Sequence, residues 1–172
     1  MTDFGPLRER EWLARRAPSA HNTQPWLLSY EADAIRLTFD ARRHLVHSDP
    51  DHRDLLLSLG AFVESLLIVA ADADVGLAFE PAIDLDRRLI GWFHRTDKLY
   101  ATAYAPQDLL RRRTSRLRLT TPKLDPAACR TLDAQLRGIE RLDLLRGEDI
   151  RDLLGPADRH LLDTPGTAAE LR

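Results

Sequence analysis

The chain has 172 residues, of which 44% are hydrophobic and 30% charged, and a formal net charge of −2 at pH 7. These values are typical of a globular protein with one domain, or with one domain and a small appendage, and the weak charge argues against nonspecific nucleic-acid binding by the whole chain. The single cysteine excludes an internal disulfide framework and a multi-cysteine zinc site. The N-terminus lacks a signal-peptide pattern and no window of 18 apolar residues predicts a membrane span, so we expect a cytoplasmic protein without membrane partners.

The first part of the chain predicts a helix followed by a β-hairpin. Pro6 suits the first turn of a helix over residues 6–16, and Pro18 ends it because the residue before a proline avoids the helical region. Two strands follow at 26–30 and 34–39, and the three residues between them are short enough for a hairpin. Apolar and polar residues alternate along the second strand, which indicates one buried face.

The strongest pattern is a long apolar helix over residues 50–72. The run Ser48-Asp49-Pro50-Asp51 offers a capping side chain, a proline for the first turn and an early acid. Apolar residues then fall on almost every face, so we expect a central helix that is buried on all sides, or one shared with a second subunit. Glu64 interrupts this surface, and the cost of an unpaired buried carboxylate predicts that it reaches the rim or pairs with an arginine.

The rest of the chain predicts short elements without a regular alternation. We expect strands at 76–83, 89–93 and 139–145, helices at 106–113, 126–136 and 148–160, a connector at 120–124 and a short helical piece at 164–172. Helices and hairpins mixed in this way favour an α+β fold over a regular βαβ fold.

The segment RAPSAHNTQPW, residues 16–26, gathers polar side chains in the turn between the first helix and the first strand. Ser and Asn side chains commonly bond the local backbone in turns, which is one interpretation of this segment. The alternative is that they face a groove and bind a polar, planar ligand. Ser19 and His21 give only weak grounds for a catalytic triad, because nucleophilic catalysis depends on geometry and not on proximity in sequence.

A second candidate site is the basic segment RRRTSR, residues 111–116. Guanidinium groups bind phosphate in a bidentate manner, and neighbouring hydroxyls add donors. The segment follows a short predicted helix, so its side chains can converge near a chain reversal. A solvated basic loop and an RNA-contacting patch are the alternatives for such a run.

Three histidines, His44, His47 and His52, lie close together in the sequence. Their spacing spans a strand end and a helix start instead of one helix face. No cysteine or second ordered pair of ligands accompanies them, so we expect capping or loop roles and no bound metal.

Together, these segments resemble the nitroreductase family, and within it the actinobacterial Acg-type branch of nitroreductase-like flavoproteins. The resemblance is carried by RAPSAHNTQPW at 16–26, FDARRHLVHSDPDHRDLL at 39–56, LGAFVESLLIVAADADVGL at 59–77 and RRRTSR at 111–116. It covers most of residues 8–122. The first motif is fairly specific, and its co-occurrence with the others around an apolar helix carries more weight than any single motif.

This resemblance implies an α+β, nitroreductase-like sandwich in which a mainly antiparallel sheet and flanking helices surround a long buried central helix. It implies FMN at the interface between two halves, with Arg112, Arg113, Thr114 and Arg116 at its phosphate. Pro18, Ser19, Ala20 and Asn22 would face the flavin or its ribityl chain from the partner half, whereas Gln24 and Trp26 would shape the turn. No catalytic side chain is implied, because the flavin carries the chemistry.

The implied function is an NAD(P)H-dependent, FMN-binding nitroreductase that passes electrons to a nitroaromatic or quinone-type acceptor. Acg-type chains contain two nitroreductase-like halves, so residues 1–172 would form a single domain equivalent to the N-terminal half and would pair as a homodimer. Two alternatives stay open: an FMN-sequestering or storage protein without turnover, and a truncated remnant that binds no flavin.

Overall fold

The computed structural model describes residues 4–114, 125–135 and 147–170, which fall into two compact units. The first unit comprises residues 1–112 and 161–172, and the second comprises residues 113–160. The strand expected at 139–145, the connector at 120–124 and the candidate phosphate ligand Arg116 lie outside the described residues. That residues 1–172 form one nitroreductase-like domain stays a prediction.

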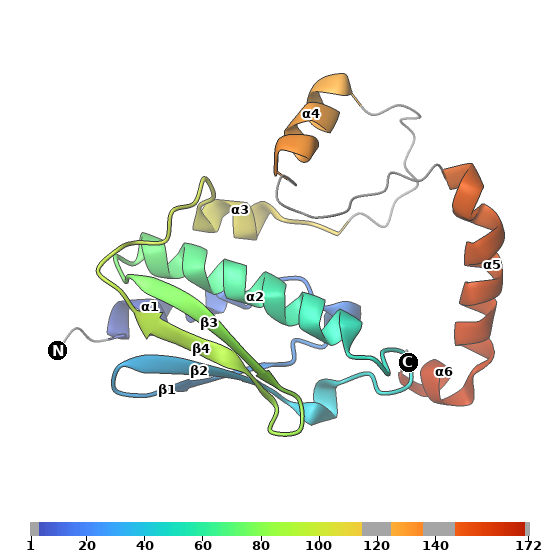
Figure 1. The fold of residues 1–172 in the computed structure, drawn as a ribbon, viewed down its shortest axis with the longest axis horizontal. Coiled ribbons are helices and arrows are strands. Elements are labelled where there is room, and N and C mark those ends of the chain that lie inside the picture. Colours follow the sequence, from blue (N-terminus) through green and yellow to red (C-terminus); the bar gives the residue numbers. More distant parts are fainter. Residues whose placement is uncertain (1–3, 115–124, 136–146, 171–172) are drawn as a thin grey trace. The chain divides into compact units, whose positions relative to one another are not determined.

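Two antiparallel hairpins form the sheet of the first unit, and the described strands have the order β1-β2-β4-β3 (Figure 1). The strands are β1 (Trp26–Tyr30), β2 (Ala34–Phe39), β3 (Leu77–Asp84) and β4 (Leu89–Arg95). The alternation predicted for β2 is confirmed, because Ile35, Leu37 and Phe39 are buried while Arg36 is exposed. The buried residues of β2 and β4 face the helices of the same unit and form its core.

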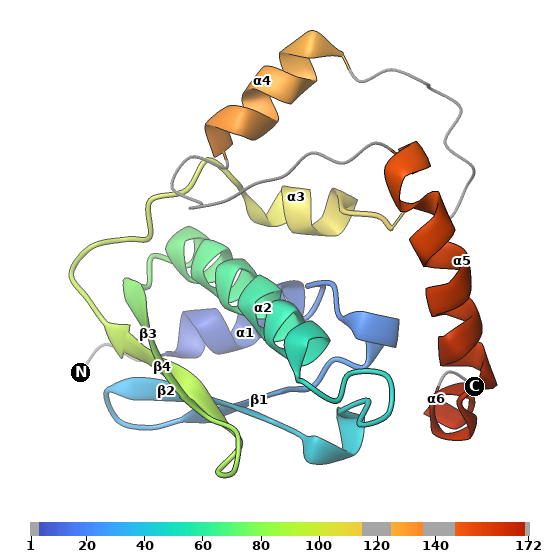
Figure 2. The same ribbon diagram turned by 45° about the vertical axis from the view of Figure 1, so that its right-hand side comes forward.

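Helices α1 (Gly5–Ala14) and α2 (Arg53–Asp72) lie on one side of this sheet, and the short α3 (Pro106–Arg111) contacts both of them (Figures 1 and 2). The chain also contains α4 (Pro126–Gln135), α5 (Gly147–Asp163) and α6 (Pro165–Glu170). Each corresponds to a helix expected from the sequence. The predicted α+β class, with an antiparallel sheet and a long, largely buried helix, is therefore confirmed.

The core between the sheet and α2 is centred on a stacked aromatic pair. The rings of Trp26 and Phe62 have centroids 4.7 Å apart and planes 11° apart, and both side chains are less than 2% exposed. Stacked aromatic pairs contribute beyond the area they bury. This contact fixes the start of β1, and with it the end of the preceding turn, against the middle of α2.

The sequence predicted that the long helix begins at residue 50, but α2 begins at Arg53. The backbone turns tightly just before it: the Asp49 N–H donates to the Leu45 carbonyl at 2.7 Å, and His52 has φ of 61°. The Asp49 carboxylate nevertheless caps the helix, because it accepts hydrogen bonds from the Asp54 and Leu55 amides at 2.9 and 2.8 Å. The sequence thus predicted correctly that a residue of the run 48–51 caps the helix, but not where the first turn begins.

In the single chain α2 is not buried on all sides, so of the two expectations the helix shared with a second subunit stays a prediction. The Leu57 side chain is 64% exposed, and a Cβ added at Gly60 would meet no atom within 4 Å. By length and composition α2 could cross a membrane, yet more than half of that apolar stretch is buried inside the protein, as in the core helix of a globular domain. One open apolar face is thus left on a helix whose other faces form the core.

Within the described residues, Glu64 pairs with a tyrosine and not with an arginine. Its carboxylate accepts a hydrogen bond of 2.7 Å from the Tyr100 hydroxyl, in the segment between β4 and α3. This hydrogen bond, with a smaller contribution from burial, raises the pKa of Tyr100 to about 12. This hydrogen bond offsets part of the desolvation cost of the half-buried Glu64 carboxylate, although the Tyr100 side chain carries no charge.

Candidate functional site

The turn between α1 and β1 has an unusual backbone. Its 3-10 segment, Ala20–Asn22, and the residues around it include His21, Asn22 and Gln24 with φ of 46°, 57° and 48°. Asparagine adopts this left-handed region more readily than most residues, but such conformations still cost on the order of 1–3 kcal/mol each. They persist only where surrounding contacts enforce them.

Hydrogen bonds from three directions hold this turn. Within it, the Ser19 hydroxyl accepts from the Gln24 N–H at 3.0 Å. Arg43, which follows β2, donates to the Thr23 carbonyl at 2.9 Å. The third comes from α2, where the Ser58 hydroxyl accepts from the Ala20 N–H at 3.1 Å. The interpretation that polar side chains bond the local backbone is therefore confirmed for Ser19.

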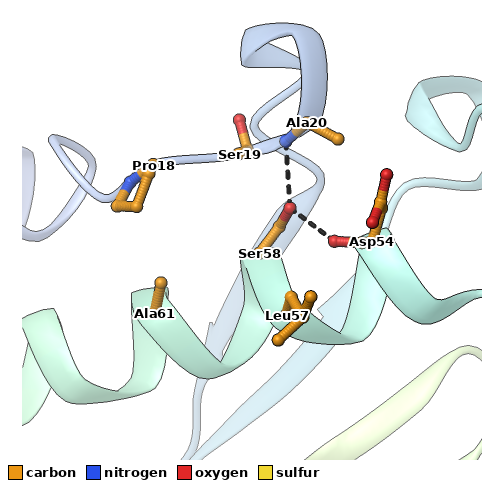
Figure 3. Close-up of a pocket in the computed structure, with 7 residues that line it drawn as sticks. All are labelled: Pro18, Ser19, Ala20, Asp54, Leu57, Ser58 and Ala61. Atoms are coloured by element: carbon orange, nitrogen blue, oxygen red, sulfur yellow. Dashed lines mark hydrogen bonds between the residues drawn. The ribbon is translucent and has the colours of Figure 1, made fainter. Parts of the chain in front are cut away.

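An open groove of about 270 Å³ lies between this turn and the exposed face of α2. Figure 3 shows the turn residues on one side of the groove and the helix residues on the other. Apolar groups of Leu57 and Ala61 lie beside polar groups of Asp54 and Ser58. The complete lining consists of Pro18, Ser19, Ala20, Asp54, Leu57, Ser58 and Ala61.

The structure brings part of the first candidate motif to this groove. Pro18, Ser19 and Ala20 line it. Asn22 is exposed and is not among the lining residues, and its side-chain oxygen accepts from the Gln24 amide group at 3.2 Å. Trp26 is buried behind the turn against Phe62, as expected of a residue that shapes it.

The basic segment is only partly connected to the groove. Arg112 lies in the first unit, and its Nε donates to the Arg16 carbonyl at 3.2 Å, two residues before Pro18. Arg113 and Thr114 are exposed and lie in the second unit. Arg112 is thus the basic residue that the described structure ties to the start of the turn.

Sequence reasoning missed the four lining residues that α2 contributes. Asp54, Leu57, Ser58 and Ala61 follow the three- and four-residue spacing of one helical face. Asp54 and Ser58 are among the few polar residues of this mostly apolar helix, and this is the available signal. A helix expected to be buried on all sides, or shared with a second subunit, gives no reason to place these residues at a groove.

The histidines near the start of α2 serve local structure. The rings of His44 and His52 stack with centroids 4.3 Å apart, and His44 Nε2 lies 2.9 Å from the Asp49 carbonyl oxygen. In the part of the chain that the structure describes, no three His, Cys, Asp or Glu side chains are grouped so that they could hold a metal ion.

Comparison with known proteins relates this chain to one group of proteins. The chain is 30% identical over 148 residues to the nitroreductase-like protein acg of Mycobacterium tuberculosis. The match includes 84% of this chain and 44% of acg. The chain is a relative of the Acg-type nitroreductase-like proteins. A second nitroreductase-like protein of M. tuberculosis is 39% identical over 59 residues, or 34% of this chain and 17% of that protein.

The chain spans less than half the length of the curated relatives that it matches. No protein-family model matches it. Two solved structures are similar in part: an NADH oxidase-like protein from Clostridium acetobutylicum, with 15% identity, and a nitroreductase family protein from Streptococcus pneumoniae, with 18% identity. Their TM-scores are 0.46 and 0.42, and they cover 62% and 63% of this chain and 87% and 88% of their own.

Proposed function

We propose that this chain provides one wall of an FMN site in an NAD(P)H-dependent, nitroreductase-type oxidoreductase. The observation that carries the proposal is the groove between the turn and α2. Three of its lining residues, Pro18, Ser19 and Ala20, are residues that the sequence motif assigned to the flavin. The relationship to acg over 84% of the chain supports the same function.

The residues of the groove suit one face of a flavin. Leu57 is largely exposed beside Ala61 and Pro18, and covering this apolar surface with a flat aromatic ring is favourable. Ser19 and the acidic residue Asp54 also line the groove, and the Asp54 carboxylate offers a hydrogen-bond acceptor to the ribityl hydroxyls. The mixture of a flat apolar surface and a few polar groups is typical of cofactor sites.

The groove is open and slightly smaller than most ligand pockets. Its volume of about 270 Å³ falls below the range of about 300–1,000 Å³ that is usual for such sites. We therefore propose that a second wall completes it. The exposed stretch of α2 at Gly60, which lies outside the groove lining, is the surface on which a second copy of the chain would pack to give a homodimer, so that Leu57 stays available to the flavin.

The phosphate of FMN would lie away from Asp54, the charged side chain in the lining, because like charges repel. We infer that Arg112 binds this phosphate, and the hydrogen bond that holds its guanidinium beside the start of the turn supports this role. Arg113, Thr114 and Arg116 complete the proposed phosphate set by their position in the same sequence motif.

When bound, FMN accepts a hydride from NAD(P)H and passes electrons to a small acceptor such as a nitroaromatic or a quinone. The chain's own residues bind and orient the ring: Leu57 and Ala61 support it, and the turn fixes its edge. A second wall over the groove would exclude water. No side chain of the groove is required as an acid, a base or a nucleophile, and the proposed setting is the cytoplasm.

The absorbance spectrum of the purified protein, before and after addition of FMN, tests flavin binding. We expect a flavin spectrum that bleaches when NAD(P)H is added without oxygen, followed by steady NAD(P)H consumption with a nitro acceptor. A protein that carries no flavin absorbance after incubation with excess FMN and removal of the unbound FMN by gel filtration would contradict the proposal. A flavin spectrum that NAD(P)H does not bleach would contradict the reductase function and would favour FMN sequestration.

A further inference from the structure

Two buried serines on α2 form the same bond within the helix but differ in one contact. Ser58 and Ser65 are 5% and 4% exposed. Each hydroxyl donates to the carbonyl four residues earlier, Ser58 to Asp54 at 2.7 Å and Ser65 to Ala61 at 2.8 Å. Ser58 alone of the two also accepts a hydrogen bond from the turn, from the Ala20 N–H at 3.1 Å (Figure 3).

The two bonds fix the direction of the Ser58 hydroxyl. A serine hydroxyl has one proton to donate and two lone pairs that accept. Its proton is directed at the Asp54 carbonyl, so a lone pair is presented to the Ala20 N–H. Because the proton is engaged within the helix, Ser58 acts on the site through Ala20 and not as a donor to a ligand.

The bond is placed where it sets the width of the groove. Ala20 belongs to the wall on the side of the turn, and Ser58 belongs to the wall on the side of the helix. Both residues also line a second cavity of about 10 Å³, on the side of Arg43 and Asp49. The Ser58–Ala20 bond thus separates the groove from this small cavity.

The same bond belongs to a chain of contacts that reaches the cap of α2. The buried Asp49 carboxylate accepts from the Asp54 N–H, the Asp54 carbonyl accepts from Ser58, and Ser58 accepts from Ala20. Ala20 is followed directly by His21 and Asn22, which have positive φ. Because positive φ is unfavourable for these residues, the turn keeps this conformation only through contacts with other parts of the protein.

We propose that Ser58 is a positioning residue for the flavin site: it holds the turn residue Ala20 against α2 and thereby sets the spacing between the two walls of the groove. This inference rests on the proposed function, because it assigns to Ser58 the alignment of that same site.

The test compares Ser58→Ala with Ser65→Ala in the full chain. Both changes remove a buried hydroxyl and a bond to the carbonyl four residues earlier, so their effects on α2 itself are matched. We expect faster hydrogen exchange of the Ala20 amide, measured without flavin, in Ser58→Ala only. We also expect the Kd for FMN to rise about 2- to 12-fold in Ser58→Ala only, the range of one net hydrogen bond.

Ser58→Thr serves as the rescue, because threonine retains a hydroxyl that can bond the carbonyl four residues earlier. We expect it to restore Ala20 protection and FMN affinity toward the wild-type values. If Ala20 exchanges equally in the two alanine variants, or if it loses protection while the Kd for FMN stays unchanged, the proposal is overturned. If wild-type protein binds no FMN, the proposed function fails by that result alone, while the exchange comparison still decides whether Ser58 holds the turn.

Discussion

Asp40 ties the end of β2 to the residue before β1. Its N–H donates to the Pro25 carbonyl at 2.8 Å, and its carboxylate accepts from the Arg42 amide at 3.0 Å and from the Arg42 guanidinium at 3.0 and 2.9 Å. The Arg42 side chain, followed by the Arg42 amide, lowers the pKa of Asp40 from 3.8 to about 2. Because the folded pKa is lowered, this stabilisation is present above about pH 4 and is lost as the pH falls toward 2.

We predict that Arg42→Ala raises the pKa of Asp40 part of the way back to 3.8, since the amide at position 42 still donates. The measurement is a pH titration of the Asp40 carboxyl carbon by NMR. Arg36→Ala is the control, because Arg36 pairs with Glu31 at 3.6 Å. If Asp40 has the same pKa in the wild type and in Arg42→Ala, the Arg42 side chain is not what lowers that pKa.

Arg112 allows a second prediction at the scale of single residues. If its guanidinium binds the FMN phosphate, Arg112→Ala should weaken FMN binding about 10- to 150-fold, the range expected for a hydrogen bond to a charged group. Arg111→Ala is the matched control, because Arg111 is the neighbouring exposed arginine at the end of α3. Fluorescence titration with FMN measures both, and similar losses in the two variants would refute a specific role for Arg112.

At the scale of elements, the start of α2 depends on a side chain outside the helix. Asp49→Ala removes the acceptor for the Asp54 and Leu55 amides, and we predict a loss of about 0.5–2 kcal/mol in the free energy of unfolding. Urea denaturation measures it. The exposed Asp51 lies in the same turn, so Asp51→Ala should change the stability by about 0.5 kcal/mol or less. If the two variants lose equal stability, Asp49 is not the cap.

The elements themselves were largely predictable because their signals are local. Strand β2 follows from alternation and β1 from its short connection to β2, and α1 and α3 each have a proline in their first turn. The start of α2 was less predictable, because Pro50 indicated a first turn while the left-handed backbone at His52 delays the helix. That conformation arises from contacts across the loop, which no short pattern in the sequence records.

At the scale of the whole molecule, the sequence predicted one side of the groove better than the other. Pro18, Ser19 and Ala20 stood out because polar side chains gather in a turn. Leu57 and Ala61 did not stand out, because the sequence of an apolar helix does not show which of its apolar residues other parts of the protein cover. The partner of Glu64, Tyr100, is 36 residues away in sequence, and such pairs depend on the tertiary fold.

Whether the open face of α2 is a flavin wall is tested most directly by an FMN titration of Leu57→Asp beside Ile83→Asp. The two side chains are similarly exposed, at 64% and 57%, so neither change should unfold the chain, but only Leu57 lines the groove. If the groove binds flavin, the Kd for FMN should rise at least tenfold in Leu57→Asp, while Ile83→Asp should bind FMN as the wild type does. Equal FMN affinity in the two variants would contradict it.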